Sequence, residues 1–527
     1  MSVEENEATM PGRAMVTLAL LLAMAVAALE QTVVSTAMPS IIAQLKGLDI
    51  YPWVFSAYLL AATVSTPIYG KLADIFGRKR ILLFGLGLFA LGSMLSGMAQ
   101  SMPALIAMRV VQGLGAGALG PIVLTMLGDL FTLQERAKVQ GLFSAVWGGS
   151  SLIGPALGGV LTDQLSWRWV FFVTVPFGLI AAWILMRYVH EKVERKSVAP
   201  IDWAGATLLA VGSFLLLMGV LGGSEISTAG TVGLLATSAV MLVLFVRQER
   251  VAADPVLPLD LVLSPNIGAA ILGSFLIGAL LFGIDTYIPL FMQGVRGGTA
   301  TAAGQMITPL FLSWSISVAV AAKVVVRLGF RRTAAVGSFL IAAGVLSLVV
   351  GAARPASPVY IFLNGMVVIR EPYFLAGMVV IGMGMGPASL SYILSVQNQV
   401  TWGRRGVATG AVTFFRTMGG ALGVGVLGAT LGFMLAGRIA ASNAVGIDIA
   451  AALRPETHKL LTIPQLAAVQ EALRLSLRDV FLQMFAMAIL ACLCSFGLRG
   501  GRAIAQGSQT TNELDREAVE LAVGIEH

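Results

Sequence analysis

Long apolar segments alternate with short polar or charged ones along the whole chain. About 20 apolar residues in helical conformation cross the hydrocarbon core of a membrane. Reading each apolar run between its flanking charges and turn residues predicts fourteen such helices. They are expected at residues 15–37, 53–73, 81–99, 103–127, 138–160, 169–188, 203–222, 230–247, 266–292, 303–325, 333–351, 373–396, 407–435 and 478–498.

The composition supports a multi-pass membrane protein. Of 527 residues, 57% are apolar and only 12% are charged, and the mean hydropathy is +0.87. Soluble domains carry roughly 25% charged residues, so a soluble, disordered or collagen-like chain is excluded. The first run, 15–37, is too long for the apolar region of a signal peptide and leads into further spans, so we expect an uncleaved first helix.

The Lys and Arg residues indicate the orientation. With the N-terminus inside, 22 of the 34 fall in cytoplasmic segments, 10 fall outside and two lie within spans. This bias predicts a protein of the cell membrane with both termini in the cytoplasm. It also explains the net charge of +7 as a topological signal, which removes the main argument for binding nucleic acid.

Three segments outside the spans stand out. Residues 359–371 place β-forming residues on both sides of Asn364-Gly365, which predicts an extracytoplasmic β-hairpin. The outside segment 436–477 contains an amphipathic stretch from Ile463 to Leu477. These two segments are the expected contact sites for an extracytoplasmic partner, and 503–527 is expected to be a polar cytoplasmic tail.

Four ionisable side chains fall within the expected spans: Glu30, Arg109, Asp285 and Arg416. Charges at that depth are costly and usually functional. A poorly solvated carboxyl can exchange protons near neutral pH, so Glu30 and Asp285 are the expected proton- or cation-binding groups. The alternative is that a buried arginine or hydroxyl satisfies each carboxyl, and Arg109 and Arg416 are the expected partners.

We find no constellation for catalysis, a cofactor or a metal. The three histidines lie in loops or the tail, and no nucleophile–base arrangement or phosphate-binding glycine loop is assembled. Cys492 and Cys494 lie two residues apart in one apolar run, where a disulfide or shared metal is not expected. A membrane enzyme or a receptor is therefore disfavoured.

The loop between the second and third spans reads Gly70-Lys-Leu-Ala-Asp74-Ile-Phe-Gly77-Arg78-Lys79-Arg80. The two glycines permit a tight cytoplasmic turn, and an ordinary positively charged loop would look similar. The loop nevertheless resembles the signature of the major facilitator superfamily at nearly every position. The resemblance implies that Asp74 and Arg78 gate the conformational change without touching substrate.

Further stretches resemble the same superfamily. Arg109-Val-Val-Gln112-Gly113 is similar to its fourth-helix motif, and Gly154-Pro155-Ala-Leu-Gly158-Gly159 is similar to its antiporter motif. Leu29-Glu30-Gln31-Thr32 resembles a signature of the fourteen-helix drug–proton antiporters, with Glu30 in place of Asp.

The resemblance implies an all-α fold of two six-helix bundles with an extra pair of helices between them. The bundles are expected at 15–190 and 266–498, and the extra pair at 203–247. A partial internal repeat agrees, because Lys323 to Arg332 matches the Lys71 to Arg80 loop in position and glycine spacing.

The expected activity is proton-coupled export of lipophilic or cationic small molecules by alternating access. The partners are then the substrate, protons and membrane lipids. A lipid or glycolipid exporter of the same fold is the alternative, and the two predicted structures outside the membrane favour it slightly.

Overall fold

A computed structural model describes residues 10–130, 133–189, 191, 202–221, 226–252, 255–257, 259–354, 360–363, 366–369, 371–400, 405–441 and 463–498. The N-terminal half consists of α1 (Met10–Leu45), α2 (Pro52–Phe76), α3 (Arg78–Met98), α4 (Met102–Leu130), α5 (Leu133–Gln164), α6 (Trp169–Phe172) and α7 (Thr174–Tyr188). Two helices, α8 (Trp203–Leu221) and α9 (Thr228–Val251), and the short α10 (Leu259–Val262) follow it.

The C-terminal half contains long helices and one pair of strands. Its elements are α11 (Pro265–Leu290), the π-helix η3 (Phe291–Val295), α12 (Ala300–Leu328), α13 (Phe330–Ala353), β1 (Tyr360–Leu363), β2 (Met366–Ile369), α14 (Pro372–Gln397), α15 (Arg405–Ala440) and α16 (Ile463–Phe496).

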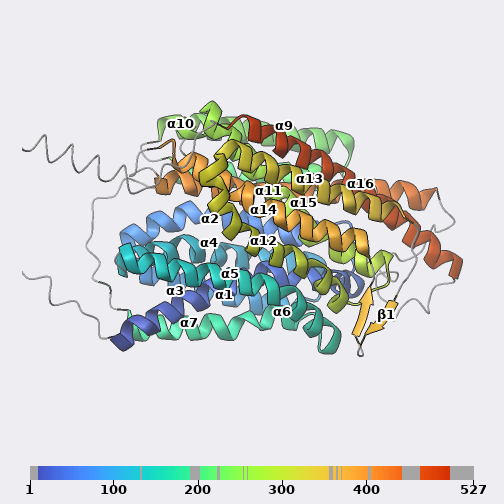
Figure 1. Ribbon diagram of the computed structural model, residues 1–527, viewed down its shortest axis with the longest axis horizontal. Helices are drawn as coiled ribbons and strands as arrows, with labels where there is room; N and C mark the ends of the chain where they lie inside the picture. Colours follow the sequence, from blue (N-terminus) through green and yellow to red (C-terminus); the bar gives the residue numbers. More distant parts are fainter. Residues whose placement is uncertain are drawn as a thin grey trace, which may run out of the picture.

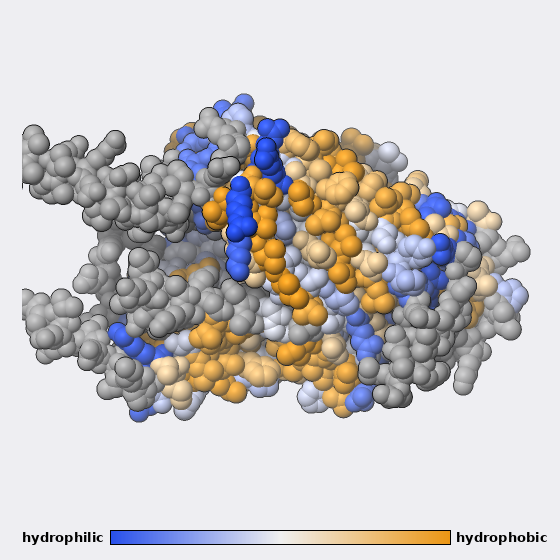
Figure 2. Space-filling model, viewed as in Figure 1, coloured by the Kyte–Doolittle hydropathy of each residue, from blue (hydrophilic) through white to orange (hydrophobic). Residues whose placement is uncertain are grey.

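Twelve helices of the described chain are long and apolar enough to cross a membrane. Two other long helices, α2 with 25 residues and α5 with 32, fall outside this set. Hydroxyl residues make α2 more polar. Two of these hydroxyls are satisfied within the helix, since Thr63 donates to the Leu59 carbonyl at 2.6 Å and Thr66 to the Ala62 carbonyl at 2.8 Å. On the face shown in Figure 2, hydrophobic residues cover most of the middle and hydrophilic ones gather toward the two ends.

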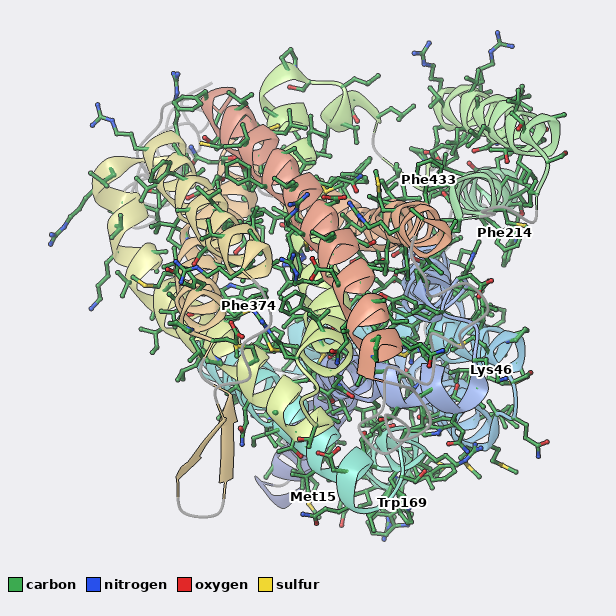
Figure 3. The ribbon with its side chains drawn as sticks, turned by 90° about the vertical axis from the view of Figure 1, so that its right-hand side faces the viewer. Met15, Lys46, Trp169, Phe214, Phe374 and Phe433 are labelled. Atoms are coloured by element: carbon green, nitrogen blue, oxygen red, sulfur yellow. The ribbon has the colours of Figure 1, made fainter. Side chains whose placement is uncertain are left out.

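The two halves lie side by side with their helices along the long axis of the molecule (Figure 1). Contacts between them join α5 to α12, α2 to α15, and α1 to both α11 and α12. The pair α8–α9 lies at one corner, where Figure 3 labels Phe214. In this pair α8 contacts α2 and α15, and α9 packs mainly on α8. Each half therefore has its own packing, with α8 touching both.

Two glycines make equivalent turns in the two halves. Gly77 separates α2 from α3 with φ 93° and ψ 145°, and Gly329 separates α12 from α13 with φ 81° and ψ 168°. Residues with a side chain avoid these angles, so glycine is required for such a short turn between helices. The two positions are the ones that the internal repeat pairs, and the structure confirms that both serve as helix-to-helix turns.

The two strands pair as the sequence predicts. Residues of β1 and β2 run antiparallel, with Tyr360 opposite Ile369 and Leu363 opposite Met366. Asn364 and Gly365 lie outside the described residues. The pair lies at the end of the molecule opposite the start of α1 (Figure 1), which we call the hairpin end.

A buried group of charges holds the chain just after β2. Arg296 follows η3, and its Nε lies 2.8 Å from an Oε1 of Glu371, the residue that precedes α14. Burial raises the pKa of Glu371, and the adjacent Arg296 cation opposes that rise. Arg474 of α16 donates to the Ala352 carbonyl at the end of α13. Three helix ends are therefore tied together beside the strands.

The last helix corrects the sequence prediction. The expected span began at residue 478, and Ile463 to Leu477 were expected to form a separate amphipathic segment outside the membrane. Instead, α16 is continuous from Ile463 to Phe496. Val469, Leu473 and Leu477 are each 0% exposed because the apolar face of the stretch packs against the protein core. Of the expected outside segment 436–477, residues 436–440 belong to α15, and 442–462 lie outside the described residues.

Candidate functional site

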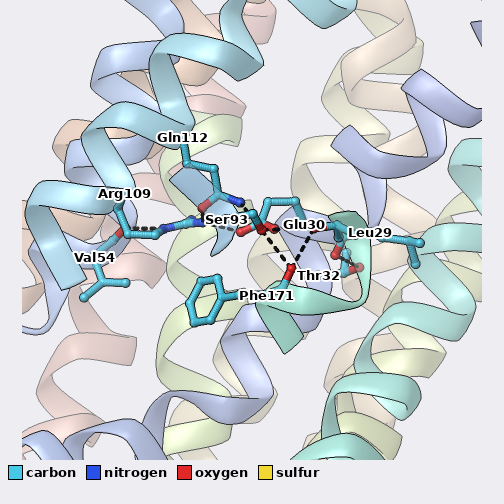
Figure 4. A network of polar contacts seen from close by, with 9 residues as sticks. Leu29, Glu30, Thr32, Val54, Ser93, Arg109, Gln112 and Phe171 are labelled. Carbon is cyan, nitrogen blue, oxygen red and sulfur yellow. Dashed lines mark hydrogen bonds and ion pairs between the residues drawn. The ribbon is translucent and has the colours of Figure 1, made fainter. Parts of the chain in front are cut away.

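A buried ion pair joins α1 to α4 in the N-terminal half (Figure 4). The Arg109 guanidinium donates to the Glu30 carboxylate, and each residue is 1% exposed. Arg109 also donates through Nε to the Val54 carbonyl of α2 at 3.1 Å, and lies 4.1 Å from the centre of the Tyr58 ring. Such contacts are needed because a cation without partners at this depth is very unfavourable.

The pair continues into a chain of hydrogen bonds toward α3 and α6. Arg109 donates to Gln112 Oε1 at 2.6 Å, and Gln112 Nε2 donates to Ser93 Oγ at 3.1 Å. Ser93 in turn donates to the Phe171 carbonyl at 2.8 Å (Figure 4). A change in the charge of Glu30 on α1 would therefore affect four other helices that the network links, α2, α3, α4 and α6.

The glycine of the fourth-helix motif allows this network to form. A Cβ at Gly113 would overlap the Tyr58 carbonyl of α2, and a Cβ at Gly92 of α3 would overlap the backbone of Gln112. Small residues at such crossings let helix backbones approach closely. The motif therefore places Arg109 where it reaches both α1 and the α2 backbone.

Asp285 of α11 is another carboxyl buried within a span, and no cation of the described residues pairs with it. It is 4% exposed and faces the Ser35 hydroxyl of α1, which donates to the Thr32 carbonyl at 3.0 Å. Among the described residues, its Oδ1 has no hydrogen-bond partner. Glu30 therefore lies on α1, and Asp285 faces α1 from the C-terminal half.

Arg416 differs from the sequence expectation. It was expected to partner a buried carboxyl, but in the described part of the chain no carboxylate pairs with it. It lines a pocket between α11, α14 and α15 instead. The physical reason is position, because Arg416 faces hydroxyl and aliphatic side chains, and Asp285 faces α1.

The glycines of the antiporter-like motif lie at two helix crossings. A Cβ at Gly154 or Gly158 would overlap α1 at Thr32 or the Val33 carbonyl. A Cβ at Gly159 would overlap the backbone of Thr301 in α12. From the other side, a Cβ at Gly304 would overlap the Pro155 carbonyl. The motif thus lets α5 pack closely against α1 in its own half and against α12 in the other half.

Several hydrogen bonds join the halves between the middle of the molecule and the hairpin end. Asp163 at the end of α5 accepts from the Thr301 backbone N–H at 2.8 Å and from the Thr301 hydroxyl at 2.6 Å. Gln293 donates to the Thr36 carbonyl at 2.9 Å. Ser56 of α2 donates to the Ala421 carbonyl of α15 at 2.8 Å. These contacts close the two halves against each other at that end.

The loop around Gly77 is held within the N-terminal half. Glu191 accepts from the backbone N–H groups of Arg78 and Lys79, each at 2.9 Å, and so caps α3. Lys79 Nζ donates to the Val189 carbonyl at 2.6 Å, beyond the end of α7. The side chain of Asp74 lies outside the described residues. Gly70 is open, with nothing within 4 Å of an added Cβ.

Sequence reasoning missed Asp163, Glu191 and Ser35. Each is a lone polar residue in or near a helix end or span, without a motif around it, and its partner is distant in sequence. In the described residues no group of three His, Cys, Asp or Glu is placed to hold a metal ion.

The sequence matches the Major Facilitator Superfamily over residues 20–424. The chain belongs to this superfamily. It is 35% identical over 417 residues to the multidrug transporter protein MdtP of Bacillus subtilis, covering 78% of this chain and 74% of that protein. It is 34% identical over 417 residues to multidrug resistance protein 3 of the same organism, covering 78% of each.

Solved structures share the fold at low sequence identity. A bacterial homolog of the human lysosomal transporter Spinster, in an inward-facing conformation, gives a TM-score of 0.65 at 16% identity. That alignment covers 94% of this chain and 100% of the other. A nucleoside transporter, NupG, gives 0.60 at 12% identity, covering 92% and 98%. This protein is therefore a multi-pass major facilitator transporter with efflux relatives, and a non-enzymatic one.

Proposed function

We propose that the protein exports lipophilic small molecules by alternating access, driven by proton entry. The observation that carries this proposal is a pair of buried carboxyls, one on α1 held by Arg109 and one on α11 facing the Ser35 hydroxyl of α1. Ionisable groups at this depth are costly, and transporters retain them for coupling. The multidrug relatives support small lipophilic molecules as the substrate class.

The proposed architecture has fourteen spans. Helices α1–α7 and α11–α16 form two bundles of six spans, α8 and α9 are the extra pair, and both termini lie in the cytoplasm. Packing within each half supports the two bundles, and the contacts of α9 mainly with α8 support an added pair. The charge bias places the Gly77 and Gly329 turns inside and the hairpin end outside the cell membrane.

In the proposed cycle, the two halves rock about α1 and its neighbours. The described structure has its inter-half hydrogen bonds toward the hairpin end, which matches a state closed to the outside. Opening at that end would separate Asp163 from α12 and bring water to Asp285. Protonation of Asp285 or Glu30 from the outside and release to the inside would then couple proton entry to export. The loop of Asp74 and Arg78 is proposed to gate closure on the inner side.

One observation favours the second candidate, a lipid or glycolipid exporter. The paired strands β1 and β2 lie at the hairpin end beside the buried Arg296–Glu371 pair, and a drug exporter has no evident need for them. A site for an extracytoplasmic partner or an acceptor of lipid would use such a structure.

Transport into proteoliposomes with an imposed pH gradient tests the proposal. Lipophilic dyes and fluorescent lipids are supplied to the side that corresponds to the cytoplasm, with and without the gradient. Gradient-dependent movement of dyes supports drug export, and gradient-dependent movement of lipids alone supports the second candidate. Equal movement of all compounds with and without the gradient would contradict proton coupling.

A further inference from the structure

A pocket in the C-terminal half contains a cation that the coupling network does not use. It is a small recess, partly open to solvent, between α11, α14 and α15. Its polar side chains are Arg416, Ser274, Ser389 and Thr413, and its other walls are aliphatic. The pocket is too small for a whole drug-sized molecule, and is suited to one polar group of a larger one.

Arg416, which is partly buried, contrasts with the buried arginines of the described chain. Arg109 pairs with Glu30, Arg296 with Glu371, and Arg474 with Glu471. Arg416 has no carboxylate partner in the described residues, although it lies in a membrane-spanning helix. A guanidinium in such a place is stabilised by an oxyanion, which it binds through two parallel hydrogen bonds. The Ser274 and Thr413 hydroxyls can donate to the same oxyanion, and Ser389 can do so if it turns away from the Met385 carbonyl, to which it donates at 2.6 Å.

We propose that this pocket binds an oxyanion group, a carboxylate or a phosphate, on an otherwise apolar substrate. The guanidinium of Arg416 and the hydroxyls of Ser274, Ser389 and Thr413 hold the anion, and the apolar part lies along the aliphatic walls. The inference rests on the proposed export function for its transport role, and it names amphipathic anions as a substrate class. The pocket and its lining side chains support binding whether or not the protein exports the bound molecule.

The depth of the pocket fits this role. Ser274 precedes Asp285 by 11 residues on α11, which is about 16 Å along a helix. The pocket is therefore nearer the inner end, where an exporter takes up its substrate, and Asp285 lies nearer the hairpin end. An anion in the pocket does not compete with a proton at Asp285, so both can be bound during one cycle.

Equilibrium binding of radiolabelled decanoate to the purified protein in nanodiscs tests the site, with empty nanodiscs subtracted. Arg416→Gln should weaken binding at least tenfold, and Arg416→Lys, which keeps the charge but loses the paired hydrogen bonds, should weaken it less than Arg416→Gln does. Lys323→Gln removes an exposed cation elsewhere in the same half and should leave binding unchanged. Equal binding by Arg416→Gln and the parent protein would overturn the proposal.

Thr413→Glu gives a second test if Arg416→Gln does not fold. Thr413 precedes Arg416 by three residues on α15, so the new carboxylate can pair with the guanidinium and take the place of the ligand. This variant should also lose decanoate binding at least tenfold. Unchanged binding by a well-folded Thr413→Glu protein would overturn the proposal.

Competing ligands with different polar groups identify which group the pocket binds. Decylamine should not displace decanoate, and displacement by decylamine at the same concentration as decanoate would overturn an anion site. Displacement by decyl phosphate extends the site to phosphates, and its failure restricts the site to carboxylates. Because binding is measured without a gradient, Arg416-dependent binding together with absent export would refute the export function alone.

Discussion

The Arg109 guanidinium lies between the Glu30 carboxylate of α1 and the Val54 carbonyl of α2, and all three groups are inside the N-terminal half. The pair is almost fully buried, and Gln112 and the Tyr58 ring complete the surroundings of the cation. Neither charge can be removed without leaving the other in a poorly solvating site. The pair therefore links α1 to α4. Protonation of Glu30 would also change the contacts that Arg109 makes with α2 and with Gln112.

Replacing Glu30 should destabilise the protein through its partner. Glu30→Gln leaves a buried cation, and breaking a buried pair in this way costs about 3–5 kcal/mol. The remaining acceptors around Arg109 should keep the loss at about 3 kcal/mol.

The double variant Glu30→Gln with Arg109→Gln should regain most of the stability. Unfolding of the purified variants in one detergent measures the cycle, and an equal loss in the double variant would contradict the pairing energy.

The same Glu30→Gln variant should lose gradient-driven export. If it exports at the full rate while folded, coupling belongs to Asp285 and the Glu30–Arg109 pair is structural only.

Asp285→Asn should separate coupling from stability. No cation among the residues that the structure describes pairs with Asp285, so the neutral amide leaves none of them unpaired and should change the free energy of unfolding by about 1 kcal/mol or less. Gradient-driven export should fall at least tenfold, because the amide cannot carry a proton. Substrate exchange without a gradient should persist.

Ser35→Ala is the matched control, since it removes the hydroxyl that faces Asp285 and keeps the carboxyl. It should export with an altered pH dependence. Gradient-driven export by Asp285→Asn at the parent rate would assign proton coupling elsewhere.

Much of the fold could be predicted from the sequence because the membrane imposes simple rules. Apolar runs between charges located the helices, and the Asn364-Gly365 pattern located the two strands. Burial of Glu30 and Arg109 in neighbouring motifs allowed their pairing to be expected. The expected start of the last helix at residue 478 was wrong, because an amphipathic period is the same for a separate helix and for one that continues a span and packs on a core.

The rest depends on contacts between distant segments. Asp163 caps α12 from α5, 137 or 138 positions away, and Glu191 caps α3 from beyond α7, 112 or 113 positions away. Nothing local to either residue distinguishes it from a solvated carboxylate. The isolation of Arg416 is likewise a property of the packing of α11, α14 and α15, and it could only be found in the structure.

The two glycines of the Gly70–Arg80 loop should respond differently to alanine. Gly77 has φ 93° and ψ 145°, where a side chain adds strain of about 1–3 kcal/mol. Gly70 lies inside α2 with nothing within 4 Å of an added Cβ, so alanine should be neutral or slightly stabilising. Gly77→Ala should lower the unfolding temperature and slow transport, and Gly70→Ala should do neither. Equal behaviour of the two variants would show that the turn does not require glycine.

Gly159 should control closure of the hairpin end. Its Cβ position is occupied by the backbone of Thr301, beside the bonds from Asp163 to the start of α12. Gly159→Ala forces α5 and α12 apart, and overpacking of this kind costs about 1–3 kcal/mol. This cost falls on the closed state and not on the open state, so the ratio of closed to open molecules should fall by about fivefold to 150-fold. Spin labels at Asp49→Cys and Gly437→Cys, with Cys492 and Cys494 replaced by serine, report the distance between the halves.

Gly149→Ala is the matched control on α5, because nothing lies within 4 Å of its added Cβ, and it should keep the parent distances. A Gly159→Ala distribution that matches the parent would show that the α5–α12 contact does not set the closed state.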